Sequence, residues 1–531
     1  MVSKKFWRQG EPYVWGTGLA LSLVLTLTCM LLYVVLANGI MVFWPKKVTL
    51  AALHDGRHFL GEIVQKEKNP GTGKGRVQFK IGNRDLYGLD FKWINDQEVK
   101  AYSLPEGVYV LERQEHGNFY GYLKELRTPG LDLPAGEKAN LQTALEIIEP
   151  QRGEVEKIDR QIAAINRTME RKNHKLAKLR YTKQENTPAA AALQTEVQEI
   201  RAEFDRLVAL LGSKRAIVSA NEAVFADADG QEKTIALVDI IRCYQPNAMS
   251  WLGKWRYYGT RIGELLFAEP RESNTEGGLF PAIFGTIMLI FLMSIFSFPL
   301  GVIAGIYLRE YAKEGYLVKM VRIAVNNLAG IPSIVYGIFG LGFFVYGIGG
   351  QIDQLFFPEK LPTPTFGTGG ILWASLTLGL LTVPVVIVAT EEALGAIPPG
   401  IREGSQALAA TKFQTLTRIL LPMASPGILT GFILAMARAA GEVAPLMITG
   451  VVKLAPALPL DGTFPFLHLD RKFMHLGFHI YDIGFQSPNV EAAKPMVYVT
   501  TLLLILIVLI LTSTAISLRN KMRERFSVAD L

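Results

Sequence analysis

Long apolar runs are the feature that most limits what this chain can fold into. Six stretches, each long enough for a helix that crosses a bilayer, alternate with charged segments. In lipid, such runs can satisfy their backbone polar groups only as helices, so they predict an α-helical polytopic membrane protein with six transmembrane helices. The predicted spans are 14–43, 280–307, 328–349, 370–390, 425–450 and 496–518.

The first apolar run, at 14–43, is too long for the core of a cleaved signal peptide, which holds about 7–15 apolar residues. It ends at Phe43 and Trp44 without a small-residue cleavage site. We therefore expect residues 1–44 to form a cytoplasmic amino terminus and an uncleaved first span.

The net charge of +7 could suggest a nucleic-acid partner, but its distribution argues against one. Most of the basic excess lies in short segments beside the apolar runs, at 4–8, 309–322, 402–418 and 519–525. Basic loops stay in the cytoplasm, so both termini and the loop 391–422 are predicted there. Residues 45–270 are then periplasmic, and the protein is predicted in a bacterial inner membrane.

The two cysteines do not form a framework. Cys29 lies in a predicted span and Cys243 in the soluble block, so we expect neither a disulfide nor a cysteine-based metal site.

Residues 45–270 are soluble in composition and predict an inserted α+β domain. Alternating patterns predict strands within 48–125 and again within 216–243. Between them, 137–212 has helical periodicity and predicts an antiparallel coiled-coil hairpin inserted into one small β-barrel or sandwich. The hairpin's heptad positions are Leu193, Val197, Ile200, Phe204, Leu207 and Leu211.

The sequence GTGKG at 71–75 only superficially resembles a phosphate-binding loop. That loop has the pattern G-x-x-x-x-G-K-[ST]: a Gly lies five positions before the Gly of the Gly-Lys pair, Ser or Thr follows the lysine, and the loop opens a helix. Here Lys68 and Gly75 occupy the two positions, so we interpret the segment as a flexible turn. No other stretch predicts a nucleotide site, and we expect no catalytic residue in this chain.

His475 and His479 are four residues apart and could present two metal ligands on one helix face. No third ligand accompanies them, so we favour an amphipathic interfacial segment within an outside loop at 453–495 and expect no metal site.

Arg438 and Glu442 lie within the predicted fifth span, at a spacing that places them on one helix face. A charge inside a membrane costs about 3 kcal/mol or more, so the pair marks either helix packing or a substrate pathway. Arginine presents a planar fork of donors that suits an oxyanion, and both interpretations stay open on the residues alone.

The cytoplasmic loop before this span resembles the EAA loop of ABC-importer permeases. Glu403, Gly404 and Ser405 begin the motif, and Ile419, Leu421 and Pro422 end it at the family spacing. Ala409 replaces the usual glycine, which predicts that the bend of the loop is held differently. The resemblance implies that this loop docks on an ATPase subunit.

Two further stretches resemble the PstA-type permeases of high-affinity phosphate importers. The segment ARAAGEVAPLMITG is similar to their R-x-x-G-E-T-A-P signature, although Val443 replaces the threonine. The segment NNLAGIPSIVYGIFGLGFF at 326–344 is typical of phosphate permeases. The resemblance implies that Arg438 and Glu442 line the substrate pathway and that Arg402 is tied to transport or to the ATPase.

The family implies a five-helix permease core at about 280–518, preceded by the first span. Its implied partners are a homologous sister permease, two ATPase subunits that bind ATP and Mg²⁺, and a periplasmic phosphate-binding protein. Alternatives are a permease for another oxyanion, or a non-transporting scaffold or phosphate-signalling protein built on 45–270. For the hairpin at 137–212, two interpretations stay open: a spacer or packing surface, or a docking arm for the sister subunit or a binding protein.

Overall fold

The computed structural model describes residues 7, 10–68, 71, 73–129, 141–462, 464–487 and 489–525. Among them, six helices are long and apolar enough to cross a membrane. They are Glu11–Met41, Phe280–Tyr311, Ser333–Phe356, Ile371–Gly395, Lys412–Gly441 and Val490–Glu524. The predicted six-span architecture is therefore confirmed, and most of residues 1–9 lie outside the described part.

The spans consist of the following elements. The first is α2 (Glu11–Met41), and the second is α7 (Phe280–Ile306) with a π-helical turn at Tyr307–Tyr311. The third joins α9 (Ser333–Phe339), a π-helical stretch at Gly340–Gly349 and α10 (Gly350–Phe356). The fourth is α11 (Ile371–Gly395). The fifth joins α13 (Lys412–Thr415), a π-helical turn at Leu416–Leu420 and α14 (Leu421–Gly441). The sixth is α17 (Val490–Arg525). Short helices α8 (Tyr316–Leu328), α12 (Pro399–Ala407), α15 (Ala444–Thr449) and α16 (Leu476–Tyr481) lie between them.

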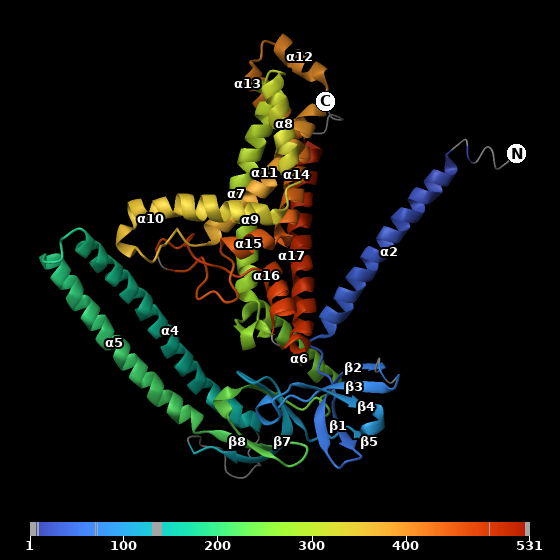
Figure 1. The fold of residues 1–531 in the computed structure, drawn as a ribbon, viewed down its shortest axis with the longest axis vertical. Coiled ribbons are helices and arrows are strands. Elements are labelled where there is room, and N and C mark those ends of the chain that lie inside the picture. Colours follow the sequence, from blue (N-terminus) through green and yellow to red (C-terminus); the bar gives the residue numbers. More distant parts are fainter. Residues whose placement is uncertain are drawn as a thin grey trace.

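Helix α11 is the most enclosed span and packs between α7 and α14. Glycines of α7 permit the close approach: a Cβ at Gly301 would lie 2.6 Å from the Cβ of Val386, and one at Gly305 would lie 2.6 Å from that of Thr390. Small residues at a helix interface let backbones approach closely, which in lipid stabilises packing by dispersion. Helix α2, in contrast, leaves the bundle and is almost wholly exposed (Figure 1).

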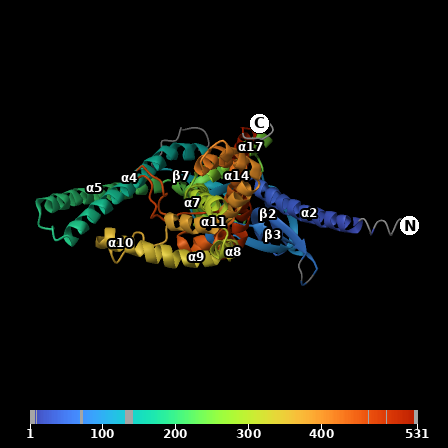
Figure 2. The same cartoon turned by 90° about the horizontal axis from the view of Figure 1, so that it is seen from above.

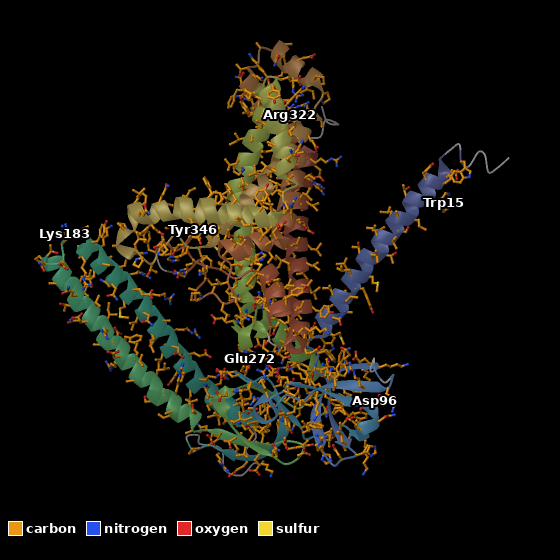
Figure 3. The ribbon with its side chains drawn as sticks, in the orientation of Figure 1. Trp15, Asp96, Lys183, Glu272, Arg322 and Tyr346 are labelled. Atoms are coloured by element: carbon orange, nitrogen blue, oxygen red, sulfur yellow. The ribbon has the colours of Figure 1, made fainter. Side chains whose placement is uncertain are left out.

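The two ends of the bundle carry different structures (Figure 1). Helix α12 lies at one end, together with the start of α2 and the end of α17. The β-strands lie at the other end, which we call the insert end. The labelled side chains of Arg322 and Glu272 mark these two ends in Figure 3.

The insert contains two five-stranded antiparallel sheets, as expected of a sandwich-like domain. The first has the order β4-β3-β2-β1-β5 and the second β10-β6-β7-β8-β9. A buried cluster containing Val48, Leu60, Val110 and Tyr120 joins the two sheets. The strands are β1 (Val48–Leu53), β2 (His58–Lys68), β3 (Gly75–Lys80), β4 (Phe91–Asn95), β5 (Val99–Ser103), β6 (Tyr109–Arg113), β7 (Phe119–Arg127), β8 (Glu222–Ala226), β9 (Glu232–Ala236) and β10 (Ile240–Tyr244), with a short helix α3 (Arg84–Tyr87).

The segment GTGKG lies in the connection between β2 and β3, and Thr72 is outside the described residues. A strand rather than a helix begins at Gly75, so the helix that a phosphate-binding loop would open is not present there.

The helical hairpin, which we call the arm, consists of α4 (Leu141–Tyr181) and α5 (Pro188–Ser219). It interrupts the connection between β7 and β8, which pair directly with each other. The arm extends on the same side of the bundle as α10, away from α2 (Figure 2). Its α4 meets two loops of the permease core, because His174 Nε2 lies 3.2 Å from Glu359 Oε1 and Arg167 Nη1 lies 3.9 Å from Asp461 Oδ2.

Several predicted boundaries are wrong. Residues 216–219 continue α5 rather than begin a strand, because Val218 is buried against the base of α4. The third span ends at Phe356 instead of residue 349, because π-helical turns carry the helix through its glycines. Residues 137–140 of the predicted hairpin lie outside the described residues.

A helix that the sequence analysis did not predict joins the insert to the bundle. This helix, α6 (Trp251–Phe267), is followed by the short strands β11 (Pro270–Arg271) and β12 (Glu276–Gly277). Its Ser250 cap accepts a hydrogen bond from the Gly253 amide, which fixes where the helix begins.

Candidate functional site

Arg438 lies in the last turn of α14, and Glu442 is the first residue beyond the helix. The prediction that both share one helix face is wrong, because Glu442 has extended backbone angles (φ −76°, ψ 135°). Pro445, in the first turn of α15, has no amide hydrogen and cannot continue a preceding helix. The predicted span 425–450 is therefore broken at residues 442–443.

The two charged side chains remain neighbours across this break. Arg438 Nε lies 3.7 Å from Glu442 Oε1, and the side chains are 39% and 20% exposed. That is an ion pair of poor hydrogen-bond geometry, and the guanidinium makes no hydrogen bond to any other residue that the structure describes. The arginine fork is therefore available to a further anionic group.

The break is enclosed by the third span. A Cβ at Gly337 would lie 2.8 Å from the Cα of Pro445, so only glycine lets α9 approach α15 this closely. The neighbouring Tyr336 is buried, donates a 2.7 Å hydrogen bond to the Leu328 carbonyl and lies within electrostatic range of Arg438. The sequence identified this stretch as typical of phosphate permeases, but it did not single out Tyr336.

The predicted coupling loop consists of two helices rather than one. Helix α12 ends at Ala407, and a turn connects it to α13, whose Thr411 and Gln414 form a capping box. The second half of the motif, which includes Ile419, Leu421 and Pro422, is continuous with the fifth span. A displacement of α13 would therefore act directly on the helix that carries Arg438.

Ala409 lies in the turn between these helices and has a φ of 58°. It thus adopts the left-handed conformation that glycine tolerates best, so the replacement does not remove the bend. A residue with a Cβ in this conformation costs about 1 kcal/mol or more.

Arg402 is bound within the loop rather than presented to solvent. Its Nη2 donates to Glu310 Oε1 at 2.8 Å and to the Leu394 carbonyl at 2.7 Å. Its Nη1 donates to the Ile397 carbonyl at 2.8 Å. These contacts join α12 to the loop-side ends of the second and fourth spans. No spacing pattern could have identified Glu310, because it lies 92 positions before Arg402.

The outer surface of the loop exposes a different set of residues. Glu403 and Gly404 are exposed, whereas Ser405 is buried and its hydroxyl lies 2.8 Å from that of Thr415. Leu408 is 86% exposed and Phe413 is 66% exposed, although both are apolar. An exposed apolar pair on a short polar loop marks a surface for a protein partner. The sequence motif identified the loop, but only the structure identifies these two side chains.

His475 and His479 do not form an interfacial segment, because both are buried. His475 caps α16 by accepting from the Gly477 amide, and His479 contacts the Asn274 carbonyl and the Thr500 hydroxyl. Burial lowers the pKa of each imidazole to about 4, so both are neutral near pH 7. Among the residues that the structure describes, no group of three possible ligands could hold a metal ion.

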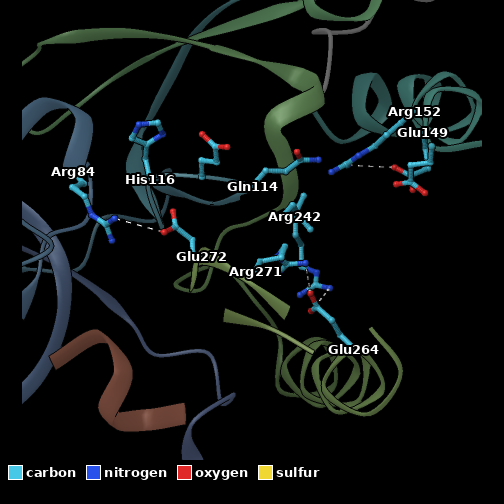
Figure 4. A pocket seen from close by; sticks show the side chains of 12 residues that line it. Arg84, Gln114, His116, Glu149, Arg152, Arg242, Glu264, Arg271 and Glu272 are labelled. Carbon is cyan, nitrogen blue, oxygen red and sulfur yellow. Dashed lines mark hydrogen bonds and ion pairs between the residues drawn. The ribbon is translucent and has the colours of Figure 1, made fainter. Parts of the chain in front are cut away.

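A polar cavity of about 920 Å³ lies in the insert, lined by residues of α3, α4, α6, β10 and the loop after β6 (Figure 4). Its arginines are matched by carboxylates, with Arg84 facing Glu272 and both Arg242 and Arg271 facing Glu264. Because its charges compensate one another, this cavity is a weaker candidate for an anion than the surroundings of Arg438.

Comparisons with known proteins agree with this organisation. The family described as binding-protein-dependent transport system inner membrane component matches residues 297–524. The phosphate transport system permease protein PstA of Yersinia pestis is 34% identical over 252 residues, which cover 47% of this chain and 76% of that protein. A probable phosphate transport system permease protein PstA of Methanocaldococcus jannaschii is 34% identical over 221 residues, which cover 41% of this chain and 67% of that protein.

A chain of the inward-facing MetNI methionine ABC transporter is 19% identical and has a TM-score of 0.34, covering 46% of this chain and 95% of that chain. The family assignment rests instead on the two relatives above. The matching family model spans the residues that carry the EAA-like loop and the Arg438 break. The chain therefore belongs to the PstA family of permeases.

Proposed function

We propose that this chain is the transmembrane permease subunit of an ATP-driven importer of inorganic phosphate and forms half of the translocation pathway. The observation that carries the proposal is the position of Arg438 and its weak pairing. Its guanidinium lies at a break in a membrane helix and is partly exposed, and among the described residues its one ion-pair partner is Glu442, at 3.7 Å. Relatives that are named phosphate transport permeases support phosphate as the anion.

The pair at the break can exchange partners during transport. A guanidinium binds phosphate oxygens through two parallel hydrogen bonds, which is better geometry than the 3.7 Å contact with Glu442. The carboxyl end of α14 also favours a cation at this position through the helix dipole. Phosphate would displace Glu442, and Glu442 would replace phosphate after release, so Arg438 is not left without a counter-charge.

Coupling to ATP hydrolysis would begin at the exposed pair Leu408 and Phe413. Their side chains would dock into an apolar groove of an ATPase subunit, which binds ATP and Mg²⁺, whereas this chain is not itself an enzyme. Arg402 would hold α12 to the ends of the second and fourth spans, so that movement of the loop reaches the bundle as a rigid displacement. Alternating access by rocking of the bundle would follow.

The assembly would contain a homologous sister permease, two ATPase subunits and a periplasmic phosphate-binding protein. In a bacterial inner membrane, the α12 end would face the cytoplasm together with both termini, and the insert would be periplasmic. The basic segments beside the spans and the common end of α12, the start of α2 and the end of α17 support this orientation (Figure 1).

The arm would act mainly as a strut. Its contacts with Glu359 and Asp461 connect the insert to two loops of the core, and the Glu359 side chain is only 3% exposed beneath His174. A docking role for the binding protein would use the opposite, solvent-facing side of the same helices.

Uptake measurements test the proposal. Proteoliposomes that contain the purified complex should accumulate phosphate on addition of ATP, and sulfate or phosphonate should compete weakly. A complex that carries Leu408→Asp should lose ATP-dependent uptake and retain less ATPase after purification, whereas Tyr316→Asp, at a similarly exposed position on α8 outside the loop, should retain both. Equal uptake of sulfate would contradict phosphate specificity, and unimpaired uptake by Leu408→Asp would contradict the docking site.

A further inference from the structure

Helix α6 carries an apolar stripe of which only half is covered by protein. Tyr258, Ile262 and Leu265 pack against Phe43 and the start of the bundle. The other half of the stripe is open to solvent, with Trp251 70% and Leu252 74% exposed and Trp255 also exposed. Adjacent large apolar side chains exposed on one helix mark a surface for an interaction.

The opposite side of α6 is fixed to the insert by buried polar contacts. The Tyr257 hydroxyl donates to Glu112 Oε1 at 2.5 Å, and Arg261 Nη1 donates to Glu112 Oε2 at 3.0 Å. One turn further along, Glu264 lies 3.3 Å from Arg242 and 2.7 Å from Arg271 (Figure 4). Because these contacts would be lost on rotation, the aromatic half of the stripe cannot turn inward.

The position of the stripe identifies what covers it. The ring of Trp255 lies 5.3 Å from that of Trp44, three residues beyond the end of the first span. The Tyr258 hydroxyl donates a 3.0 Å hydrogen bond to the Ile40 carbonyl, inside that span. The stripe is therefore continuous with the end of a membrane-crossing helix, at the depth where aromatic side chains gather in a bilayer.

The charges around the stripe fit the same surroundings. Lys254 and Arg256 flank the exposed aromatics on either side, and the exposed Lys46 and Lys47 follow Trp44. A helix with Trp and Leu on one face and basic residues beside them is typical of segments that lie in the plane of a membrane interface.

We infer that α6 is an interfacial membrane anchor, with Trp251, Leu252 and Trp255 at the boundary between the headgroups and acyl chains of the leaflet at the insert end. The anchor holds the insert on the bilayer beside the first span. It also sets the orientation from which the arm reaches the core loops. This inference is independent of which anion the protein transports.

Spin-label accessibility tests the anchor in the full chain, purified with its co-purifying subunits and placed in phosphatidylethanolamine–phosphatidylglycerol nanodiscs. Cys29 and Cys243 are first replaced by alanine, and a nitroxide is attached at Leu252→Cys or, as the matched control, at Thr260→Cys. Thr260 is exposed and lies about half a turn from Trp251 around the same helix.

The label at 252 should collide several-fold more with membrane-soluble oxygen than with a water-soluble nickel chelate, and the label at 260 should show the reverse ratio. A nickel preference at 252 would overturn the inference, because the stripe would then face water. Low accessibility to both reagents at 252 would also overturn it, because a protein partner would then cover the stripe.

Discussion

Two arginine–glutamate pairs in this molecule have the same chemistry and opposite environments. Arg402 at the coupling loop donates to Glu310 and to two backbone carbonyls at 2.7–2.8 Å. Within the described part of the chain, Arg438 at the helix break is paired only with Glu442, at 3.7 Å, and its side chain is more exposed than that of Arg402. A guanidinium with its donors satisfied fixes a structure, whereas one with free donors can bind a ligand. The difference separates a mechanical joint from a substrate contact.

The largest effect on phosphate uptake should come from breaking the Arg438–Glu442 pair. Arg438→Ala removes the fork that would bind phosphate, and truncating one member of a charge-assisted contact costs about 2 kcal/mol or more. We expect phosphate uptake to fall by about 30-fold or more. Arg438→Lys keeps the charge without the fork and should retain part of the activity, with normal levels of complex in both variants. Uptake near the wild-type rate in Arg438→Ala would remove the arginine from the pathway.

Breaking the Arg402–Glu310 pair should reduce uptake less, and it should act on the coupling to ATP hydrolysis. Arg402→Ala leaves Glu310 buried without its partner, at a cost of about 3 kcal/mol to the local structure, much of which the loop can relieve by moving. We expect about a tenfold loss of uptake per ATP hydrolysed, with phosphate affinity unchanged. The measurement is the ratio of transported phosphate to released phosphate from ATP.

The nearby Arg322–Glu391 pair provides a control for this variant, because it also joins neighbouring helices at the α12 end but is more exposed. Arg322→Ala should disturb coupling less than Arg402→Ala. A change in phosphate affinity without a change in coupling in Arg402→Ala would show that the two pairs are not distinguished as proposed.

Removing the charge of Glu442 tests whether this carboxylate competes with phosphate for Arg438. Glu442→Gln removes a negative charge that would compete with phosphate for Arg438, and a partly exposed ion pair of this kind contributes about 1 kcal/mol. We expect phosphate to bind about fivefold more tightly, by equilibrium binding to the purified complex, and to be released more slowly. Weaker binding would mean that Glu442 orients Arg438 rather than competes for it.

The smallest effect should come from substitutions at Ala409, in the turn between α12 and α13, and it should be on stability. Ala409→Gly relieves the cost of a left-handed alanine, about 1 kcal/mol, although the flexibility of glycine in the unfolded chain offsets part of it. We expect transport to be unchanged and the thermal midpoint of the complex to rise by about 1–2 °C. Ala409→Val, which is bulkier in the same conformation, should lower the midpoint, and a lower midpoint for Ala409→Gly would contradict the strain.

The transmembrane helices were predictable because a chain in lipid must satisfy its backbone hydrogen bonds within each helix. A run of apolar residues must be helical there, so six spans follow from composition alone. The approximate place of the arm followed from its heptads, and the charged pair from its cost in a membrane. The 4-3-4-3 spacing of the apolar stripe could have predicted helix α6, but only the structure shows which half of that stripe is covered. The buried state of His479 depends on contacts with Asn274 and Thr500.

The sequence by itself determined which segments enter the membrane, which loop carries the coupling motif and which ionisable residues lie inside a span. These are local properties, set by the solvation of each residue and its neighbours along the chain. Only the tertiary structure decided that Arg402 is occupied and Arg438 is open, since their surroundings come from residues such as Glu310 and Tyr336, about 90 or more positions away. The same holds for α6, whose exposed face is fixed by Glu112 across 145 positions of the chain.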